Sequence, residues 1–133
     1  MPQGSDDIIT RLRHAYEAYS RGDFDSAIEL AHPDVELITT GGFTHIRGAD
    51  EVRAWMEPET LEAAVIEPLQ FEVARNAVLV HQRSRGRGVA SGIDVETDFW
   101  TVWKFDEEGR ATHIVAFNSD DEAGARAAAG LSG

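Results

Sequence analysis

Four basic residues recur at every second position in the second half of the chain: His81, Arg83, Arg85 and Arg87. Alternate residues of a β-strand point to the same face, so a strand here would gather these side chains. Histidine can act as an acid or base near neutral pH, and arginine binds a carboxylate or carbonyl. If Leu79, which shares their parity, faces the interior, His81 and Arg83 form a candidate catalytic pair. The alternative is a solvated strand end beside the glycine-rich stretch at 86–92.

Neutral side chains that could line the same cavity come from other parts of the chain. Hydroxyl and amide groups could hydrogen-bond a ligand, although a structural hydrogen bond within the protein is their commoner role. Aromatic rings could line the cavity, although rings at these spacings more often belong to a plain core. The candidate ligand-binding residues are Tyr16, Tyr19, Thr39, Trp55, Thr101, Trp103 and Asn118.

Neither a metal nor an organic cofactor is expected. The five histidines show neither HxH nor HExxH spacing, and the chain has no cysteine. The GRG at 86–88 lacks the strand-to-helix context of a phosphate-binding loop.

The stretch from Ile93 to Asn118 should hold these residues in place, because it predicts two long strands joined by a tight turn at 106–109. Each strand face carries large apolar groups, whereas a sheet with one wet face would alternate more cleanly. One face should therefore cover a core or pocket, and the other should pack against a second subunit. The first face carries Phe99, Thr101, Trp103 and Phe105, and the second carries Trp100, Val102 and Lys104.

Three helices are expected in the first half of the chain. Ser5 or Asp6 can cap a first helix that ends at Gly22, and Asp23 can cap a shorter one that Pro33 stops. A third helix opens at 48–50. It should bury Val52, Trp55 and Met56 and end at Pro58.

The remaining elements are mostly strands. They are expected at 35–40, 43–47, 61–74 and 77–85, with Pro68 marking an edge or a bulge. A capping box at 119–122 should start a last helix that ends near Gly130. This order predicts an α+β fold in which helices pack on a curved, mostly antiparallel sheet. Such a sheet forms a cone whose open mouth suits a small molecule.

The length and net charge of the chain limit the number of domains and the kinds of partner that we expect. The 133 residues suffice for a single domain, 1–133, and the net charge of −12 should repel nucleic acid and anionic lipid. The chain has no run of 18 apolar residues, so we expect no membrane span. The absence of cysteine and of a basic-then-apolar N-terminal pattern leads us to expect a cytoplasmic protein.

Four segments together resemble one superfamily: AYEAYSRGDFDSAIELAHPDVELIT, IRGADEVRAWM, DFWTVWKFDEEGRATHIVAFN and DDEAGARAAAGL. They are similar to the nuclear-transport-factor-2-like superfamily, and most of all to its SnoaL-like branch, which includes ketosteroid isomerases and polyketide cyclases. The resemblance covers nearly the whole chain. It implies a cone-shaped, cystatin-like α+β barrel roll and a homodimer paired through the outer sheet face.

The catalytic residues of these relatives do not carry over. The resemblance places the isomerase base at Thr39, the oxyanion tyrosine at Ala15, beside Tyr16, and the second aspartic acid at Thr101. Threonine does not take a proton from carbon near pH 7. The acid of the cyclases would fall near Ala116. Epoxide hydrolases of the superfamily use an Asp-Arg-Asp set, for which Arg83 or Arg85 could supply the arginine, but Asp98 should point outward.

Three classes of function therefore stay open. The first is a small-molecule pocket protein that binds a small, largely apolar ligand. The second is a cofactor-free isomerase, cyclase or hydrolase that uses His81 and Arg83. The third is a non-catalytic dimeric interaction module whose cone is filled. Fold alone does not choose among them.

Overall fold

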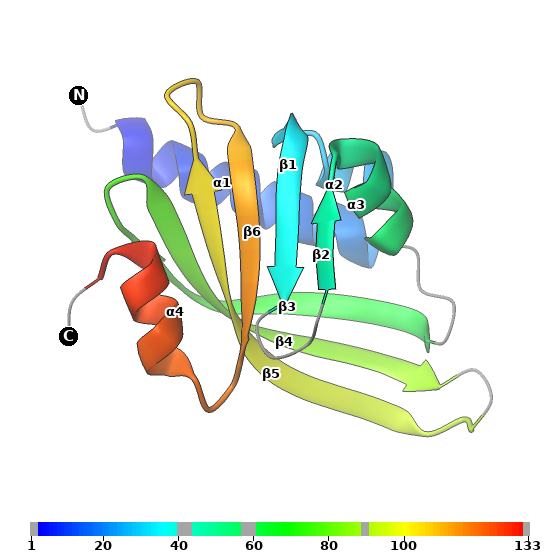
Figure 1. The fold of residues 1–133 in the computed structure, drawn as a ribbon. Coiled ribbons are helices and arrows are strands. Elements are labelled where there is room, and N and C mark those ends of the chain that lie inside the picture. The colour runs from blue at the N-terminus through cyan, green and yellow to red at the C-terminus, as the bar shows by residue number, and fades with distance from the viewer. Residues whose placement is uncertain (1–2, 40–43, 57–60, 89–90, 132–133) are drawn as a thin grey trace.

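The computed structural model describes residues 3–39, 44–56, 61–88 and 91–131, which hold four helices and six strands (Figure 1). In chain order these elements are α1 Gln3–Ser20, α2 Phe24–Ala27, β1 Ala31–Thr39, β2 Thr44–Arg47, α3 Ala49–Met56, β3 Leu61–Val73, β4 Ala77–Gly88, β5 Asp94–Phe105, β6 Ala111–Asn118 and α4 Glu122–Ala129.

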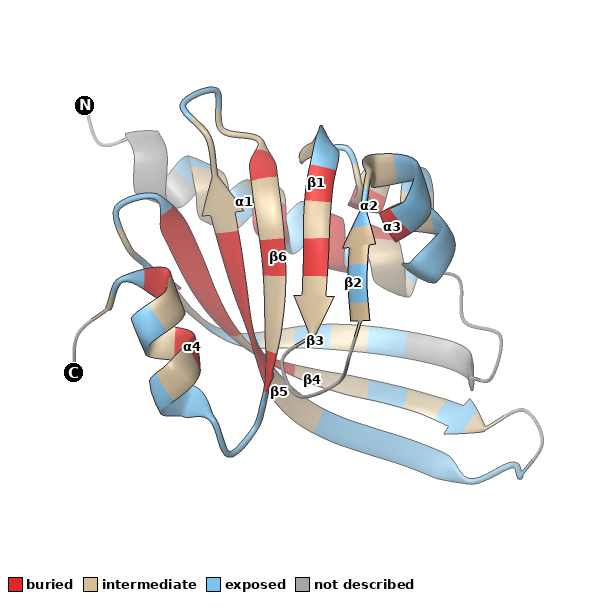
Figure 2. Cartoon of the chain, in the orientation of Figure 1, coloured by how far each residue is buried: buried red, intermediate tan, exposed pale blue. Residues whose placement is uncertain are grey.

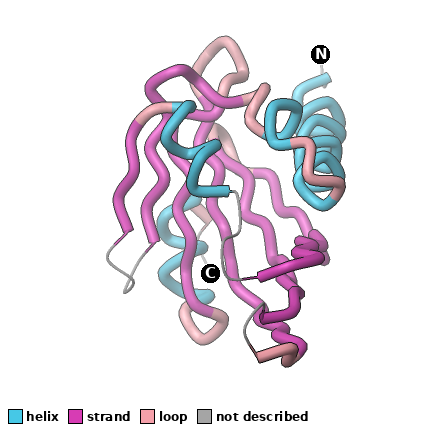
Figure 3. The backbone as a smooth tube through the Cα atoms, turned by 90° about the vertical axis from the view of Figure 1, so that its right-hand side faces the viewer, coloured by secondary structure: helices cyan, strands magenta, loops and turns pink. Residues whose placement is uncertain are grey.

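The strands form one sheet in the order β2-β1-β6-β5-β4-β3. All neighbours run antiparallel except β1 and β6, which run parallel. The sheet is curved and unclosed, and the view turned by 90° shows the N-terminal helix standing to one side of it (Figure 3). The expected α+β fold, a curved and mostly antiparallel sheet with N-terminal helices, is confirmed.

Local signals explain where α1 ends and where α2 begins. Gly22, with φ 79°, ends α1, and the Asp23 carboxylate caps α2 by accepting the Ser26 N–H at 3.3 Å. Two predicted boundaries were wrong. α1 begins at Gln3, before Ser5, and α2 ends at Ala27 instead of continuing to Pro33. Pro33 lies inside β1, where the register with β6 is irregular.

The strand predictions near Pro68 are confirmed, because β3 is an edge strand and its register shifts between Pro68 and Gln70. The connection predicted at 86–92 is shorter than expected, since β4 continues to Gly88. The predicted glycine break at 41–42 and the predicted helix end at Pro58 lie outside the described residues.

Two apolar cores lie on opposite faces of the sheet, and Figure 2 shows the buried positions along the central strands. On the inner face, α1 and α3 pack against β1, β4, β5 and β6. On the outer face, α4 packs against β4, β5 and β6. Figure 1 shows α1 and α4 on opposite sides of the sheet.

The outer core corrects one interpretation of the sequence. Trp100 and Val102, which were expected to meet a second subunit, are 8% and 0% exposed because they pack with Ala125 and Ala129 of α4 in the same chain. Within the described residues, no helix combines the length and hydropathy needed to cross a membrane.

Candidate functional site

A cavity of about 200 Å³, called the pocket below, lies between α1 and the inner face of the sheet. Its lining is mostly apolar and aromatic and comes from α1, α2, α3 and all strands except β2. The polar residues of the lining are Tyr16, Tyr19, Thr39, Gln82, Ser84 and Thr101.

The strand register explains why this space is open. Thr101, Ala116 and Thr39 lie side by side across β5, β6 and β1 on the inner face. Their small side chains leave room above the sheet. The next row carries Val78, Trp103, Ile114 and Leu37, and these side chains form part of the inner core. A row of small residues beside a row of large ones therefore makes the hollow.

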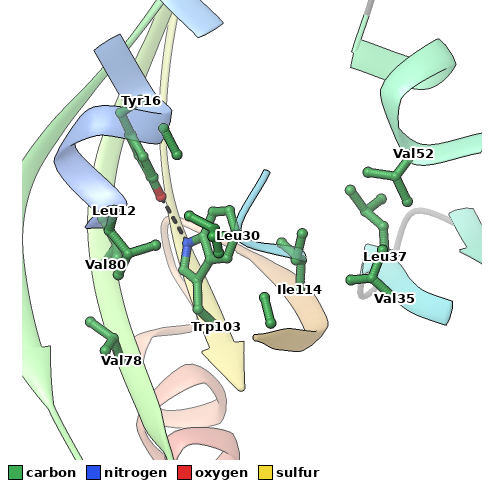
Figure 4. Close-up of a cluster of buried hydrophobic side chains, with 12 residues drawn as sticks. Leu12, Tyr16, Leu30, Val35, Leu37, Val52, Val78, Val80, Trp103 and Ile114 are labelled. Carbon is green, nitrogen blue, oxygen red and sulfur yellow. Dashed lines mark hydrogen bonds between the residues drawn. The ribbon is translucent and has the colours of Figure 1, made fainter. Parts of the chain in front are cut away.

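A chain of two hydrogen bonds forms one wall of the pocket. The Trp103 indole N–H donates to the Tyr16 hydroxyl oxygen at 3.1 Å, and that hydroxyl donates to Gln82 Oε1 at 2.5 Å. Figure 4 shows Tyr16 reaching from α1 toward Trp103. All three side chains are buried. Burial raises the pKa of the Tyr16 hydroxyl far above its usual value. The hydrogen bond from Trp103 lowers this pKa by less than burial raises it.

The Thr101 hydroxyl is a buried polar group of the pocket wall that lacks a hydrogen-bond partner among the described residues. Thr101 is 4% exposed, and its Oγ1 atom has no hydrogen-bond partner among the described residues. A buried hydroxyl left unpaired costs about 1–3 kcal/mol. A ligand group that reached this oxygen would recover that free energy.

The other predicted lining residues have different surroundings. Thr39 lines the pocket, but its hydroxyl already accepts the Thr44 N–H at 3.1 Å, so it has a structural role at the β1–β2 connection. The Tyr19 ring packs edge-on against Phe24 with centroids 5.5 Å apart, and burial raises the pKa of its hydroxyl. Trp55 lines the pocket and is 51% exposed, which places it at the mouth.

Asn118 does not join these residues. It shares the parity of Ala116, which lines the pocket, but it lies at the exposed end of β6 outside the lining. The ligand-binding role given to the other six residues stays a prediction.

The premise behind the catalytic pair was wrong. Leu79 packs under α4 on the outer face, so His81 and Arg83 lie outside the pocket. The His81 ring stacks on the Trp100 indole with centroids 4.3 Å apart, and its Nε2 atom lies 3.9 Å from an Asp98 carboxylate oxygen.

Arg83, Arg85 and Arg87 of β4 face acidic residues of β5, and we call these pairs the ion-pair ladder. Arg83 donates to both carboxylate oxygens of Asp98, at 2.8 and 3.2 Å. The hydrogen bond from Arg83 lowers the pKa of Asp98 and raises that of Arg83. Asp98 points outward, as its parity indicated. The other ladder pairs are Arg85 with Glu96 and Arg87 with Asp94.

The sequence interpretation missed Gln82 and Ser84, the β4 residues that do line the pocket. Four consecutive apolar residues at 77–80 hide which parity faces inward, because helices cover both faces of β4. The ladder itself held a signal, since a row of alternating arginines is typical of a solvated face.

Within the described ranges, no group of three or more His, Cys, Asp or Glu is arranged to hold a metal ion.

Comparison with known proteins agrees with this architecture. A family model described as a SnoaL-like domain matches residues 12–114. No curated protein matches.

Several solved structures are similar at low sequence identity, which shows the fold alone. An NTF2-like protein of unknown function from Burkholderia pseudomallei K96243 is 24% identical, with a TM-score of 0.75 over 88% of this chain and 94% of that chain. An LEH-like epoxide hydrolase of Mycobacterium tuberculosis is 17% identical, with a TM-score of 0.72 over 88% and 86%. Another Mycobacterium tuberculosis protein, in complex with estradiol-17β-hemisuccinate, is 12% identical, with a TM-score of 0.71 over 85% and 95%.

Proposed function

Because the chain belongs to the SnoaL-like domain family, we propose that its pocket binds one small, largely apolar organic molecule. The observation that carries this proposal is the apolar pocket of about 200 Å³ with the unpartnered Thr101 hydroxyl in its wall. Apolar cavities of about 150 Å³ take up benzene. A ligand with a single substituted ring therefore suits the pocket in size, and a similar fold holds estradiol-17β-hemisuccinate.

The described side chains favour binding over catalysis. Among the described lining residues, none is Asp, Glu, His, Lys or Arg. Tyr16 keeps its proton because burial raises its pKa, so it does not act as a base near neutral pH. His81 and Arg83, the pair on which the enzymatic alternative relied, lie on the other face of the sheet.

The homodimer through the outer face stays a prediction, as does the cytoplasmic location. α4 already covers Trp100 and Val102, so a partner on this face would meet other residues, such as those of the ion-pair ladder. Pairing through such a surface would be sensitive to salt.

The proposal can be tested by nuclear magnetic resonance with acetophenone as the probe. Trp55 and Trp103 line the pocket, whereas Trp100 lies under α4 on the other face. We expect saturable shifts of the Trp55 and Trp103 indole N–H signals and no shift of the Trp100 signal. Equal shifts of all three signals, or none, would overturn the proposal.

A filled pocket provides a second arm of the test. Ala116→Leu adds apolar volume inside the lining and should abolish binding. Ala127→Leu places the same side chain on the exposed face of α4 and should bind acetophenone as the parent does. Acetophenone binding that survives in Ala116→Leu would show that the ligand sits elsewhere.

A further inference from the structure

Each hydrogen bond in the pocket wall has an identifiable donor and acceptor. These assignments decide which polar group is left to face a ligand. The wall joins three elements: Trp103 on β5, Tyr16 on α1 and Gln82 on β4. Their exposed fractions are 7%, 6% and 4%, so water competes little for these bonds.

The direction is fixed at the indole. Its N–H is a donor and has no acceptor capacity, so the Tyr16 oxygen must accept from Trp103. The Tyr16 hydroxyl donates its own proton to Gln82 Oε1, because no other acceptor for it is found among the described residues. Burial raises the pKa of Tyr16, so the phenol keeps that proton well above neutral pH. Gln82 must therefore supply its carbonyl oxygen to Tyr16.

The nitrogen is what remains of the Gln82 amide. It carries two N–H donors, and it makes no hydrogen bond with the residues the structure describes. Gln82 lines the pocket, so these donors belong to the pocket wall. Gln82 pairs with Phe99 and Val80 pairs with Thr101, which makes Gln82 and Thr101 diagonal neighbours on the inner face. The unpartnered Thr101 hydroxyl thus supplies a second donor nearby.

We infer that Gln82 determines specificity in the pocket and selects a neutral carbonyl compound, whose oxygen accepts the free amide N–H. This inference rests on the proposed function and adds the polarity of the ligand. A carbonyl oxygen pairs a donor that an isosteric hydrocarbon would leave unpaired. An anion is disfavoured, because no cationic side chain stands among the described lining residues to offset its desolvation.

Acetophenone and α-methylstyrene test this inference, because they have the same shape and differ by C=O against C=CH₂. One added hydrogen bond of ordinary strength corresponds to about a tenfold change in affinity. We expect acetophenone to bind about tenfold more tightly than α-methylstyrene. The side-chain NH₂ protons of Gln82 should shift further downfield with acetophenone than with α-methylstyrene, because only the carbonyl accepts a hydrogen bond from them. This measurement needs no variant.

Gln82→Glu reverses the polarity of the wall. Above the pKa of the new carboxyl group, one oxygen accepts from Tyr16 and the other offers no donor, so the preference for acetophenone should be lost. Below that pKa the carboxyl group regains an O–H donor, and the preference should return. A merely structural role for Gln82 would not produce this pH profile. Gln70→Glu, at an exposed position of neighbouring β3, is the matched control and should keep the parent preference at every pH.

The outcomes distinguish a failure of this inference from a failure of the proposed ligand-binding function. Equal binding of the two probes by the parent protein overturns the inference and leaves the pocket as a binding site. Binding of neither probe overturns both. A preference that Gln82→Glu retains at high pH removes Gln82 as its source.

Discussion

Tyr16 shows how one hydroxyl can organise a site. Its hydroxyl accepts a hydrogen bond from Trp103 of β5 and donates one to Gln82 of β4, so a single phenol links α1 to two strands. Its companion Thr101 is the opposite case, a buried hydroxyl without a partner in the described structure. One residue therefore ties three elements together, and the hydroxyl of the other has hydrogen-bonding capacity that the described residues do not use.

The first prediction concerns Tyr16→Phe. The change leaves the Trp103 N–H and the Gln82 oxygen without their bonds, so the free energy of unfolding should fall by about 1–3 kcal/mol. Urea denaturation measures this loss. Tyr19→Phe is the control, because Tyr19 also lines the pocket but shows no hydrogen bond of its hydroxyl to a described residue, and it should cost less. Equal losses in the two variants would contradict this account.

The second prediction has the opposite sign. Thr101→Val replaces an unpartnered hydroxyl with a methyl group of similar size, so the free energy of unfolding should stay constant or rise by about 1 kcal/mol. Thr39→Val removes the acceptor of the Thr44 N–H and should destabilise the protein by about 1 kcal/mol. A marked loss of stability in Thr101→Val would show that its hydroxyl is bonded after all.

At the scale of elements, the outer face of β4 and β5 is buried at one end of the strands and exposed at the other. Near Leu79 and Val102 both faces are buried, between α1 and α4. Farther along, the outer face carries the ion-pair ladder and becomes exposed, as Figure 2 shows. Cross-strand pairs of opposite charge stabilise this end of β3, β4 and β5, which the residues of the outer core do not reach.

The third prediction is a pH dependence of the ladder. Arg83 lowers the pKa of Asp98 in the folded protein. The pair therefore contributes stability above the unfolded pKa of about 3.9, and that contribution is lost as pH falls through the lower folded value. The difference in unfolding free energy between the parent and Asp98→Asn should be full at pH 7 and shrink toward pH 2. A difference that stays constant over this range would contradict the assignment.

At the scale of the whole molecule, one sheet serves two cores. The inner core surrounds the pocket, and the outer core holds α4 against the sheet. The pocket can stay open because the outer core and the rows of large inner residues stabilise the fold without filling it.

The fourth prediction tests this division. Leu79 is 1% exposed although it lies on the outer face, so Leu79→Ala should cost about 2–5 kcal/mol of unfolding free energy. Acetophenone affinity should change little, because Leu79 is not part of the pocket lining. Chemical denaturation and the indole titration measure the two effects. A small loss of stability would mean that α4 does not bury this side chain in solution.

The fifth prediction is the oligomeric state. Light scattering should give twice the chain mass of 14.6 kDa, since the family resemblance implies a homodimer. Raising the salt concentration should shift the protein toward the monomer if the ladder takes part in pairing. A monomer at low salt would contradict the prediction.

The sequence by itself determined the types and order of the elements, the α+β fold and the family. These follow from local signals: periodic apolar residues, the Asp23 cap, the turn at Gly22 and the bulge at Pro68. It also brought Tyr16, Thr101 and Trp103 to one cavity, because alternation along β5 and the stripe of α1 both survive folding unchanged.

Only the tertiary structure decided which face of β4 meets the pocket. A strand covered on both faces is apolar at consecutive positions, so alternation carries no information at 77–80. The choice depends on α4, which lies some forty residues later in the chain and covers Leu79. That packing turned His81 and Arg83 outward and brought Gln82 into the pocket, where the direction of two hydrogen bonds leaves its amide N–H without a partner among the described residues.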